Sequence, residues 1–183
     1  MFKYATEPYE HQELLFKQTR ALEYFGFFWE MGLGKTKEAL DTAAWLYHEG
    51  LIDSLLVITY NGVHLNWTES EVPKHLHENC EHLALAWNSG RYSDGTKYYL
   101  AQLDTLSSHK GLQVLSMNIE AFARDKAFNY AMAWLKSRNC MVVIDESHAI
   151  KDPRAKRTKK ILKLRPFAKY RRVMTGTPTG GNP

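Results

Sequence analysis

The sequence predicts an α/β fold in which a mostly parallel β-sheet is flanked by helices on both faces. Continuously apolar segments, among them residues 54–59 and 140–144, have the composition of strands that are buried on both faces. Segments with helical character, among them residues 37–46, alternate with these strands. Such alternation is typical of right-handed crossovers around a parallel sheet, in which ligands bind at the carboxyl ends of the strands.

The bulk composition bounds the class of protein. The chain has 183 residues, which suggests one domain over residues 1–183, and it is 44% hydrophobic. No apolar run is long enough to span a bilayer, so we expect no membrane partner. The N-terminus lacks the apolar core of a signal peptide, and Cys80 and Cys140 give no disulfide framework. We therefore expect a globular protein of a reducing compartment, the cytoplasm.

The first elements surround a glycine-rich segment. A helix is predicted to follow Pro8 and to carry Gln12. The apolar and aromatic segment 24–29 has the composition of a buried strand, and the helix over residues 37–46 is closed by Gly50, a usual C-terminal signal.

The rest of the chain continues the alternation. Residues 60–62 form a turn at the carboxyl end of the strand over residues 54–59, and residues 63–77 look helical until Pro73 disturbs the helix. Further strands are predicted over residues 81–87, 112–117 and 171–174, helices over residues 96–106 and 119–137, and a loop over residues 88–95.

The glycine-rich segment has the residues of a phosphate-binding loop, although Trp29 stands where the full pattern has a glycine. Gly32 and Gly34 let the backbone N–H groups point toward an anion, where the helix N-terminus adds partial positive charge. Lys35 would reach the outer phosphates of a nucleotide, and the Thr36 hydroxyl would ligate Mg²⁺. A plain glycine turn, the alternative, does not need Lys-Thr. The predicted nucleotide-binding residues here are Met31, Gly32, Leu33, Gly34, Lys35 and Thr36.

Two adjacent carboxylates, Asp145 and Glu146, end the apolar strand over residues 140–144. Neighbouring strand side chains point to opposite faces, but this rule relaxes at the end of a strand, so both acids can enter one site. Asp145 would hold Mg²⁺, largely through water, and Glu146 would orient the attacking water or accept its proton. With Lys35, they are the predicted catalytic residues. A surface acid pair is the alternative, which the preceding apolar run disfavours.

Other polar residues complete the predicted site. The Gln12 side-chain amide both donates and accepts, so it can read adenine; a solvated position on a helix is the alternative. His148 is interpreted as coupling the γ-phosphate to the neighbouring segment, with loop capping as the alternative. Thr175 and Thr177 would bridge the nucleotide site to a bound strand, with turn chemistry as the alternative.

The charge is unevenly distributed. Residues 151–172 hold eleven Lys or Arg residues and one acid, Asp152, and so carry +10, whereas the remainder has 13 basic and 19 acidic residues and carries −6. A basic segment on an acidic body suggests a polyanion partner, and a solvated helix face is the alternative. Asp152-Pro153 is a good helix start.

These segments occur together in one known order, in which they resemble the first RecA-like lobe of superfamily-two helicases and translocases. The resemblance is greatest to the Swi/Snf-type branch, including compact phage and bacterial members, and covers nearly the whole chain. Residues 30–36 are similar to its motif I almost letter for letter, residues 145–148 to motif II and residues 175–178 to motif III. Two departures are Trp29, where many members have Asp, and Ser147, where Ala or Cys is more frequent.

The resemblance implies a RecA-like P-loop NTPase that binds ATP with Mg²⁺ and moves along duplex or branched DNA. Gln12 falls at the position of the family's adenine-reading glutamine. Residues 56–71 and 114–122 resemble motifs Ia and Ib, whose loops contact a nucleic-acid backbone, so binding should be salt-sensitive and largely sequence-independent. The implied DNA-binding residues are Tyr60, Asn61, Met117 and Asn118.

The resemblance also implies a partner. The ATPase site of this family lies between two RecA-like lobes, and the second lobe supplies an arginine that stabilises charge on the γ-phosphate. The residues up to Pro183 resemble the first lobe only. We therefore expect weak nucleotide binding and very slow hydrolysis, with a second lobe in cis or in trans as partner. A phage-encoded member would act in the interior of the host cell.

Two rival functions fit part of the sequence. A small P-loop kinase or packaging-type ATPase shares the phosphate loop, but it gives no reason for the position of Gln12 or for the turn over residues 175–178. A non-catalytic nucleotide- or DNA-binding adaptor fits a chain without the arginine-bearing lobe. Sequence beyond Pro183 would discriminate between a motor and an adaptor.

Overall fold

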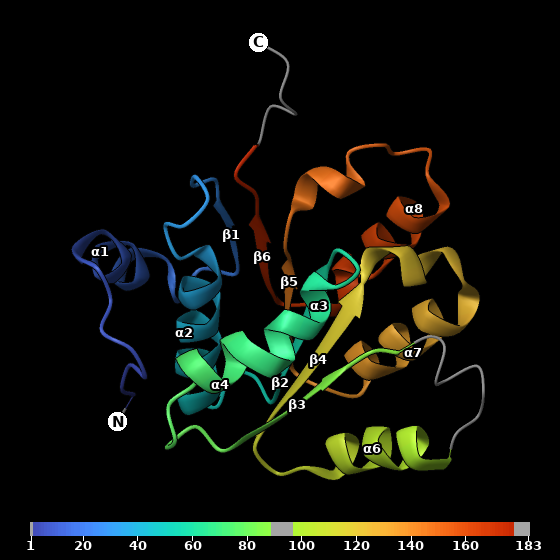
Figure 1. Cartoon of the computed structure of the whole chain (residues 1–183), viewed down its shortest axis with the longest axis horizontal. Helices are drawn as coiled ribbons and strands as arrows, with labels where there is room; N and C mark the ends of the chain where they lie inside the picture. The colour runs from blue at the N-terminus through green and yellow to red at the C-terminus, as the bar shows by residue number, and fades with distance from the viewer. Residues whose placement is uncertain (1, 89–96, 178–183) are drawn as a thin grey trace.

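Six parallel strands form one sheet in the computed structural model, which describes residues 2–88 and 97–177 (Figure 1). Their order across the sheet is β1-β6-β5-β2-β4-β3, so the predicted parallel sheet is confirmed. The predicted loop over residues 88–95 lies almost entirely outside the described residues. The strands are β1 (Tyr24–Phe27), β2 (Ser54–Thr59), β3 (His82–Ala86), β4 (Leu112–Asn118), β5 (Cys140–Ile144) and β6 (Tyr170–Met174).

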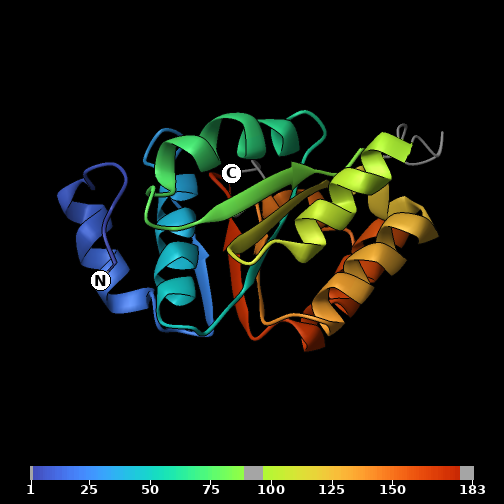
Figure 2. The ribbon, with the colours of Figure 1, turned by 90° about the horizontal axis from the view of Figure 1, so that it is seen from below.

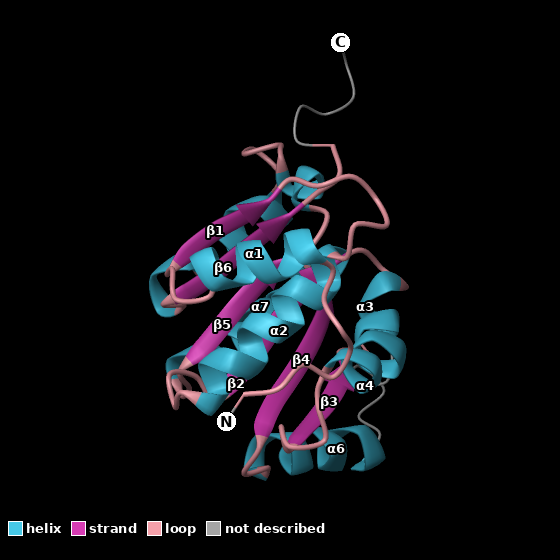
Figure 3. Cartoon of the chain, turned by 90° about the vertical axis from the view of Figure 1, so that its left-hand side faces the viewer, coloured by secondary structure: helices cyan, strands magenta, loops and turns pink. Residues whose placement is uncertain are grey.

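Helices cover both faces of the sheet, as predicted. One face carries α2 (Lys35–His48), with α1 (Glu10–Thr19) packed beside it, and a continuous helical stretch of α3 (Val63–Asn66), η1 (Trp67–Glu71) and α4 (Val72–His75) (Figure 3). The other face carries α6 (Lys97–Ser108), α7 (Asp125–Lys136) and α8 (Lys156–Lys163), and Figure 2 shows α2 and α7 on opposite sides of the sheet. Short turns are η2 (Ile119–Ala123), η3 (Ser147–Ile150) and η4 (Arg165–Phe167). No helix of the described residues is long and apolar enough to cross a membrane.

Strand β2 shows how the two layers are fixed. Leu55 and Val57 are fully buried in the cluster that includes α2, whereas Leu56 and Ile58 are fully buried in the cluster that includes α7. This alternation is the two-residue period of a strand, and each such side chain contributes about 1.5–3 kcal/mol when it is buried. A strand packed on both faces cannot slip its register, because a shift of one residue would exchange the two sets. The turn after β2 is therefore held in a defined place.

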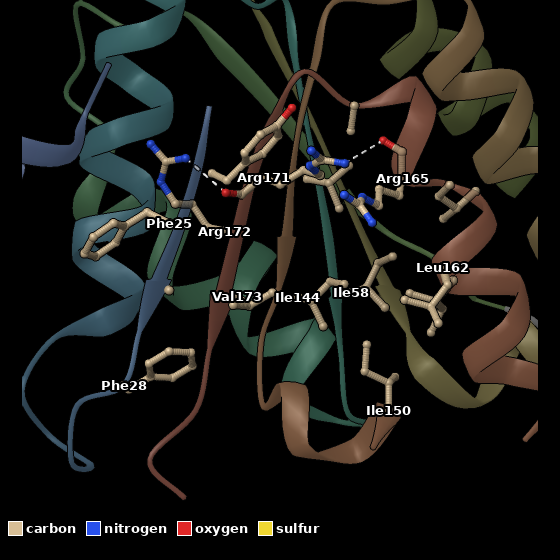
Figure 4. Close-up of a pocket in the computed structure, with 16 residues that line it drawn as sticks. Phe25, Phe28, Ile58, Ile144, Ile150, Leu162, Arg165, Arg171, Arg172 and Val173 are labelled. Atoms are coloured by element: carbon tan, nitrogen blue, oxygen red, sulfur yellow. Dashed lines mark hydrogen bonds between the residues drawn. The ribbon is translucent and has the colours of Figure 1, made fainter. Parts of the chain in front are cut away.

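The first strand differs from the prediction. Among the described strands, β1 lies at the edge of the sheet and pairs with β6 alone; Phe27 is fully buried, but Tyr24 is 57% exposed. An apolar groove of about 510 Å³ runs along β1 and β6 on the face of the sheet that carries α7 and α8. The groove is bounded by β5 and by α8 (Figure 4). Val173 lies on this face, whereas Phe25 packs beside Phe27 on the opposite face, against the cluster that includes α2. The aromatic residues of β1 therefore reflect burial on the α2 face, although the strand lies at the edge of the sheet.

Two predicted helices also differ. The segment 119–137 is not one helix: the 3₁₀ turn η2 and helix α7 are separated by Arg124, whose backbone is extended at φ −95° and ψ 146°. Asp152-Pro153 does not start a helix, because the Asp152 carboxylate accepts the Arg154 N–H at 2.8 Å in a turn, and α8 begins only at Lys156. The helical stretch after β2 does continue to His75, and Pro73 lies directly after the π-helical turn η1, where the α-helical hydrogen-bond pattern is already interrupted.

Candidate nucleotide-binding site

The glycine-rich loop connects the end of β1 to the first turn of α2. Gly32 and Gly34 both have φ of +81°, a left-handed conformation that glycine adopts without steric cost. Gly34 is the residue that caps α2, and its carbonyl accepts the Glu38 N–H at 3.1 Å as the first bond of the helix. Because α2 has 14 residues and starts at Lys35, its N–H groups and its dipole converge on the loop.

A cavity of about 600 Å³ opens in front of this loop. Met31, Gly32, Gly34, Lys35 and Thr36 line one side of it, whereas the Leu33 side chain does not. The cavity also contains Gln12 and both carboxylates of the strand end, Asp145 and Glu146. The remaining lining residues are Thr6, Glu7, Tyr9, Lys37, Glu71, Lys74 and His75.

Lys35 is held against the loop itself. Its ammonium donates to the carbonyl oxygens of Trp29 at 2.8 Å and Glu30 at 3.1 Å. Within the part of the chain that the structure describes, the partners of this largely buried side chain are neutral carbonyls rather than carboxylates. A positive charge without an acidic partner at a phosphate-binding loop is suited to bind an anion.

Gln12 connects α1 to the loop. Its Oε1 accepts the Tyr9 N–H at 2.9 Å, and its Nε2 donates to the Leu33 carbonyl at 3.0 Å. Gln12 is almost fully buried, and a Cβ atom added at Gly34 would overlap its Nε2. The amide still has one N–H and one lone pair for a base, so the predicted adenine contact stays compatible with these bonds.

Asp145 is fixed at the end of β5 by three donors. Trp67 Nε1 donates to its Oδ2 at 3.1 Å, Thr59 Oγ1 donates to the same oxygen at 3.3 Å, and the Glu146 N–H donates to Oδ1 at 2.9 Å. Burial raises the pKa of the Asp145 carboxyl, and these bonds oppose the rise. The donors therefore stabilise the ionised form, which is the form that binds a metal ion.

Glu146 has an unusual backbone. With φ 51° and ψ 52°, it is the non-glycine residue with positive φ among the described residues. Such a conformation costs about 1–2 kcal/mol and is found at functional sites when the surroundings hold it. Its carboxylate lies 3.2 Å from His148 Nδ1 and 3.5 Å from Thr175 Oγ1. The acids thus diverge, Asp145 toward Trp67 and Glu146 toward β6.

The residues predicted to couple the site lie after β5 and β6, and those predicted to contact DNA lie after β2 and at the end of β4. His148 and Thr175 contact each other at 3.1 Å, and the Thr177 N–H donates to Thr175 Oγ1 at 3.1 Å. Asn61 is exposed in the turn after β2, whereas Asn118 is 8% exposed and donates to Glu120 at 3.3 Å. Tyr60, at the start of the same turn, lies with its hydroxyl 3.1 Å from His148 and so joins the two groups of residues.

The structure contradicts the DNA contact predicted for Met117. Strand β4 extends one residue beyond the predicted end, to Asn118, so Met117 still lies inside the strand. Its side chain is fully buried in the cluster with α6 and α7. A direct contact between this side chain and DNA has no surface to use, and the contact predicted for Met117 is wrong.

Two partners of Asp145 were missed by the sequence analysis. Trp67 and Thr59 lie 78 and 86 residues from Asp145 in the chain, and no local pattern connects them. A signal was nevertheless present: Trp67 lies on the helix that follows β2 and must pack on the sheet, and a buried indole N–H needs an acceptor. The carboxyl ends of β2 and β5 are adjacent, which brings the acceptor to it.

Trp67→Phe is expected to destabilise the protein by about 1–3 kcal/mol, because a buried carboxylate loses a hydrogen-bond donor. It should also weaken Mg·ATP binding, because Asp145 loses its orientation. Urea denaturation and nucleotide titration measure the two effects. Trp45→Phe, a half-buried indole of α2, is the matched control and should leave nucleotide binding unchanged. Equal effects of both variants on nucleotide binding would contradict the role given to Trp67.

The residues present fit a magnesium nucleotide. Nothing lies within 4 Å of a Cβ built on Gly32, so phosphate oxygens can approach the loop backbone closely. The Asp145 carboxylate and the Thr36 hydroxyl border the same cavity and are oxygen ligands of the kind that Mg²⁺ prefers. Lys35 and the N-terminus of α2 supply the positive charge that a triphosphate needs.

A parallel α/β sheet with a phosphate-binding loop after β1 and an acid pair after β5, from which β1 is separated by β6, defines a RecA-like nucleotide-binding domain. The family model described as the SNF2-related domain matches residues 27–183, and the chain belongs to this family.

Relatives with known names agree with this family. The chain is 27% identical over 157 residues to the ATP-dependent helicase fft1 of Schizosaccharomyces pombe, a match that covers 84% of this chain and 15% of that protein. The Sulfolobus solfataricus SWI2/SNF2 ATPase core in complex with dsDNA has a TM-score of 0.71 at 22% identity, covering 97% of this chain and 33% of that chain. The UvsW helicase from bacteriophage T4 has a TM-score of 0.66 at 13% identity, and the match covers 97% of this chain and 55% of that chain. The chain thus spans only part of the length of these proteins.

Proposed function

We propose that residues 1–183 form one RecA-like lobe, the ATP-binding first motor lobe of an ATP-dependent DNA translocase. The observation that carries this proposal is a single cavity that joins the phosphate-binding loop to the Asp145–Glu146 pair. Lys35 stands at that loop without an acidic partner among the described residues. Membership in the SNF2-related family, together with an ATP-dependent helicase as relative, supports ATP as the nucleotide.

Each residue has a separate task in this proposal. Lys35 would leave the carbonyls of the loop to bind the outer phosphates. Thr36 and Asp145 would hold Mg²⁺, which would neutralise charge on the phosphates. Glu146 orients the attacking water and accepts its proton. Gln12 uses its remaining N–H and lone pair to read the adenine edge.

A second lobe completes the site in this proposal. In related phosphoryl-transfer systems, an arginine from outside the nucleotide-binding domain accelerates turnover by about 10³–10⁵. We propose that such an arginine comes from a second RecA-like lobe, in cis or in trans, and that residues 1–183 alone bind ATP and hydrolyse it very slowly. The solved relatives, of which this chain covers 33% and 55%, support a larger motor.

DNA is the proposed track. The S. solfataricus relative is an ATPase core in complex with dsDNA, which supports duplex DNA as ligand of this chain. The more accessible candidates lie at the carboxyl edge of the sheet: the half-buried Tyr60 and the exposed Asn61 after β2, and the exposed Thr177 after β6. Asn118 and Thr175 lie just behind this edge and are mostly buried. We expect these residues to contact the sugar-phosphate backbone of the DNA rather than its bases.

Helix α8 is a second candidate for the DNA surface, and its lysines are not equivalent. Lys160 is 8% exposed and pairs with Asp125 at 2.7 Å, so its role is to hold α8 against the start of α7. Lys156, Lys159 and Lys163 are exposed. The exposed set therefore isolates DNA binding from folding, whereas replacement of Lys160 would confuse the two.

Changing Lys156, Lys159 and Lys163 together to Glu is expected to weaken duplex binding and to flatten its salt dependence. Removal of each lysine–phosphate pair reduces the slope of log K against log salt by about 0.9. Fluorescence anisotropy with a labelled duplex at several salt concentrations measures both quantities.

The matched control makes the same charge change at the exposed residues Lys3, Lys17 and Lys110, which lie on other elements. Its affinity should fall only slightly, with the slope retained. An unchanged affinity and slope in the α8 variant would assign this helix to another partner.

ATP turnover by the chain with and without duplex DNA tests the proposed function. We expect saturable Mg·ATP binding, very slow turnover, and faster turnover once the arginine-bearing lobe of a relative is added. Saturable DNA binding without any nucleotide binding would favour the adaptor instead. Phosphate transfer to a small acceptor, with no response to DNA, would favour a kinase.

A further inference from the structure

Four side chains from three strand ends form a connected set at the carboxyl edge of the sheet. Tyr60 follows β2, Glu146 and His148 follow β5, and Thr175 follows β6. The Tyr60 hydroxyl lies 3.1 Å from His148 Nε2, and the two rings contact each other with centroids 5.7 Å apart. On the other side of the imidazole, Nδ1 lies 3.2 Å from Glu146 Oε2 and 3.1 Å from Thr175 Oγ1.

The chemistry of these groups favours one direction for the hydrogen bonds. His148 Nδ1 bonds to Thr175 Oγ1 and lies 3.2 Å from Glu146 Oε2, so a proton on Nδ1 avoids placing its lone pair against a carboxylate oxygen. In a neutral imidazole the other nitrogen, Nε2, is then an acceptor, and the Tyr60 hydroxyl donates to it. Thr175 Oγ1 accepts the Thr177 N–H and turns its own proton toward Glu146. With this tautomer the hydrogen bonds run in one direction, from Tyr60 to His148, from His148 to Thr175 and from Thr175 to Glu146, and the Nδ1 proton also faces the Glu146 carboxylate.

We propose that Tyr60 is a positioning residue of the catalytic site. By donating to Nε2, it selects the His148 tautomer that holds the Glu146 carboxylate, and it thereby connects the loop after β2 to that carboxylate. The role of Glu146 in hydrolysis rests on the proposed function, whereas the hydrogen-bonded set itself does not.

The backbone of Glu146 gives this set its importance. A left-handed glutamate costs about 1–2 kcal/mol, which its surroundings must offset. Its N–H donates to Asp145 and its carbonyl accepts the Ala149 N–H, while its carboxylate is held by His148 and Thr175. A change in the His148 tautomer removes the contact with His148, because Nδ1 without a proton repels the carboxylate.

The position of Tyr60 indicates when such a change occurs. Tyr60 is half-buried and is followed by the exposed Asn61 and by Gly62, whose φ is +86°. A polyanion bound at this turn offers phosphate oxygens, which accept hydrogen bonds and compete with His148 for the Tyr60 hydroxyl. The resting set thus holds Glu146 until DNA occupies the turn. Coupling free energies between two sites typically change binding affinity by about 5–150-fold, and we expect an effect on turnover of similar order.

Tyr60→Phe tests this inference, because it keeps the ring contact and removes only the hydroxyl. Nitrogen-15 NMR of the imidazole side chains reports the tautomer directly, and His148→Gln identifies the His148 signal among the eight histidines of the chain. We expect the Nδ1–H tautomer in the wild-type chain and a shift toward the Nε2–H tautomer in Tyr60→Phe. Addition of a short duplex to the wild-type chain should move the signal in the same direction.

Tyr98→Phe, at a 71% exposed position of α6, is the matched control and should give the wild-type spectrum. The Nε2–H tautomer in the wild-type chain would overturn the inference without any variant. Identical His148 signals in the wild type and in a folded Tyr60→Phe would also overturn it.

Turnover separates this inference from the proposed function. With the second lobe of a relative added, the ratio of turnover with DNA to turnover without DNA should fall at least about fivefold in Tyr60→Phe, while the KM for ATP is retained. In the His148→Ala background, Tyr60→Phe should not lower this turnover ratio further, because Tyr60 acts through His148. A tautomer shift in a chain that binds no nucleotide would refute the proposed function and leave the hydrogen-bonded set intact.

Discussion

Lys35→Ala is expected to lower the affinity for Mg·ATP by about a hundredfold or more. Hydrogen bonds to charged groups contribute about 1.5–3 kcal/mol each, and every 1.4 kcal/mol is tenfold in affinity, so the absence of two such bonds to phosphate suffices. The fold should tolerate the change, because the hydrogen bonds of Lys35 in the structure go to the carbonyls of Trp29 and Glu30 at the loop surface. Isothermal titration with Mg·ATP, together with a thermal melt, measures both effects.

The matched control for Lys35 is Lys74→Ala. Lys74 lies on α4, is exposed, and borders the same cavity, so its removal changes the general charge of the cavity equally. We expect a loss of affinity of less than about fivefold, because a surface charge at high dielectric contributes little. Equal losses in the two variants would mean that the cavity attracts anions without a specific phosphate contact.

Gly34→Ala is expected to destabilise the protein by about 2–5 kcal/mol and to prevent nucleotide binding. A left-handed alanine costs about 1–2 kcal/mol, and the displaced Gln12 loses its bond to Leu33, which costs about 1–3 kcal/mol more. The overlap arises because a Cβ at Gly34 meets the Gln12 amide. Urea denaturation measures the change in the free energy of unfolding.

The loop provides its own control for this prediction. Gly32 has the same φ of +81°, but nothing lies within 4 Å of its added Cβ, so Gly32→Ala should cost only the strain of about 1–2 kcal/mol. In a Gln12→Ala background, Gly34→Ala should become as mild as Gly32→Ala, because the overlap is gone. If the difference between the two glycines persists there, Gln12 is not its cause.

Local chemistry explains what the sequence analysis predicted correctly. Strand β2 matches the prediction residue for residue, since six apolar or small side chains in succession have no other place than a buried strand. The loop before α2 was found because glycine, lysine and threonine each meet a separate requirement at fixed spacing. Gly50 ends α2 in a left-handed conformation at φ +68°, as the usual C-terminal signal predicts.

Contacts between distant segments explain what was missed. The break at Arg124 leaves no mark on composition, because it reflects how η2 packs against α8 rather than a local helix breaker. Met117 was predicted at the last position of its strand, next to the loop, but β4 continues to Asn118 and is buried along its whole length, so Met117 belongs to the core. The contacts that orient the site, Trp67 with Asp145 and Tyr60 with His148, join residues 78 and 88 positions apart and depend on the strand order.

The titration of ATP into the wild-type chain, with and without Mg²⁺, tests the central claim most directly. The claim is that the loop with Lys35 and the carboxylate Asp145 together form one magnesium-nucleotide site. We predict saturable one-site binding that Mg²⁺ strengthens, with the gain from Mg²⁺ lost in Asp145→Asn. A folded chain that shows no saturable binding, or binding that ignores Mg²⁺, would contradict the account.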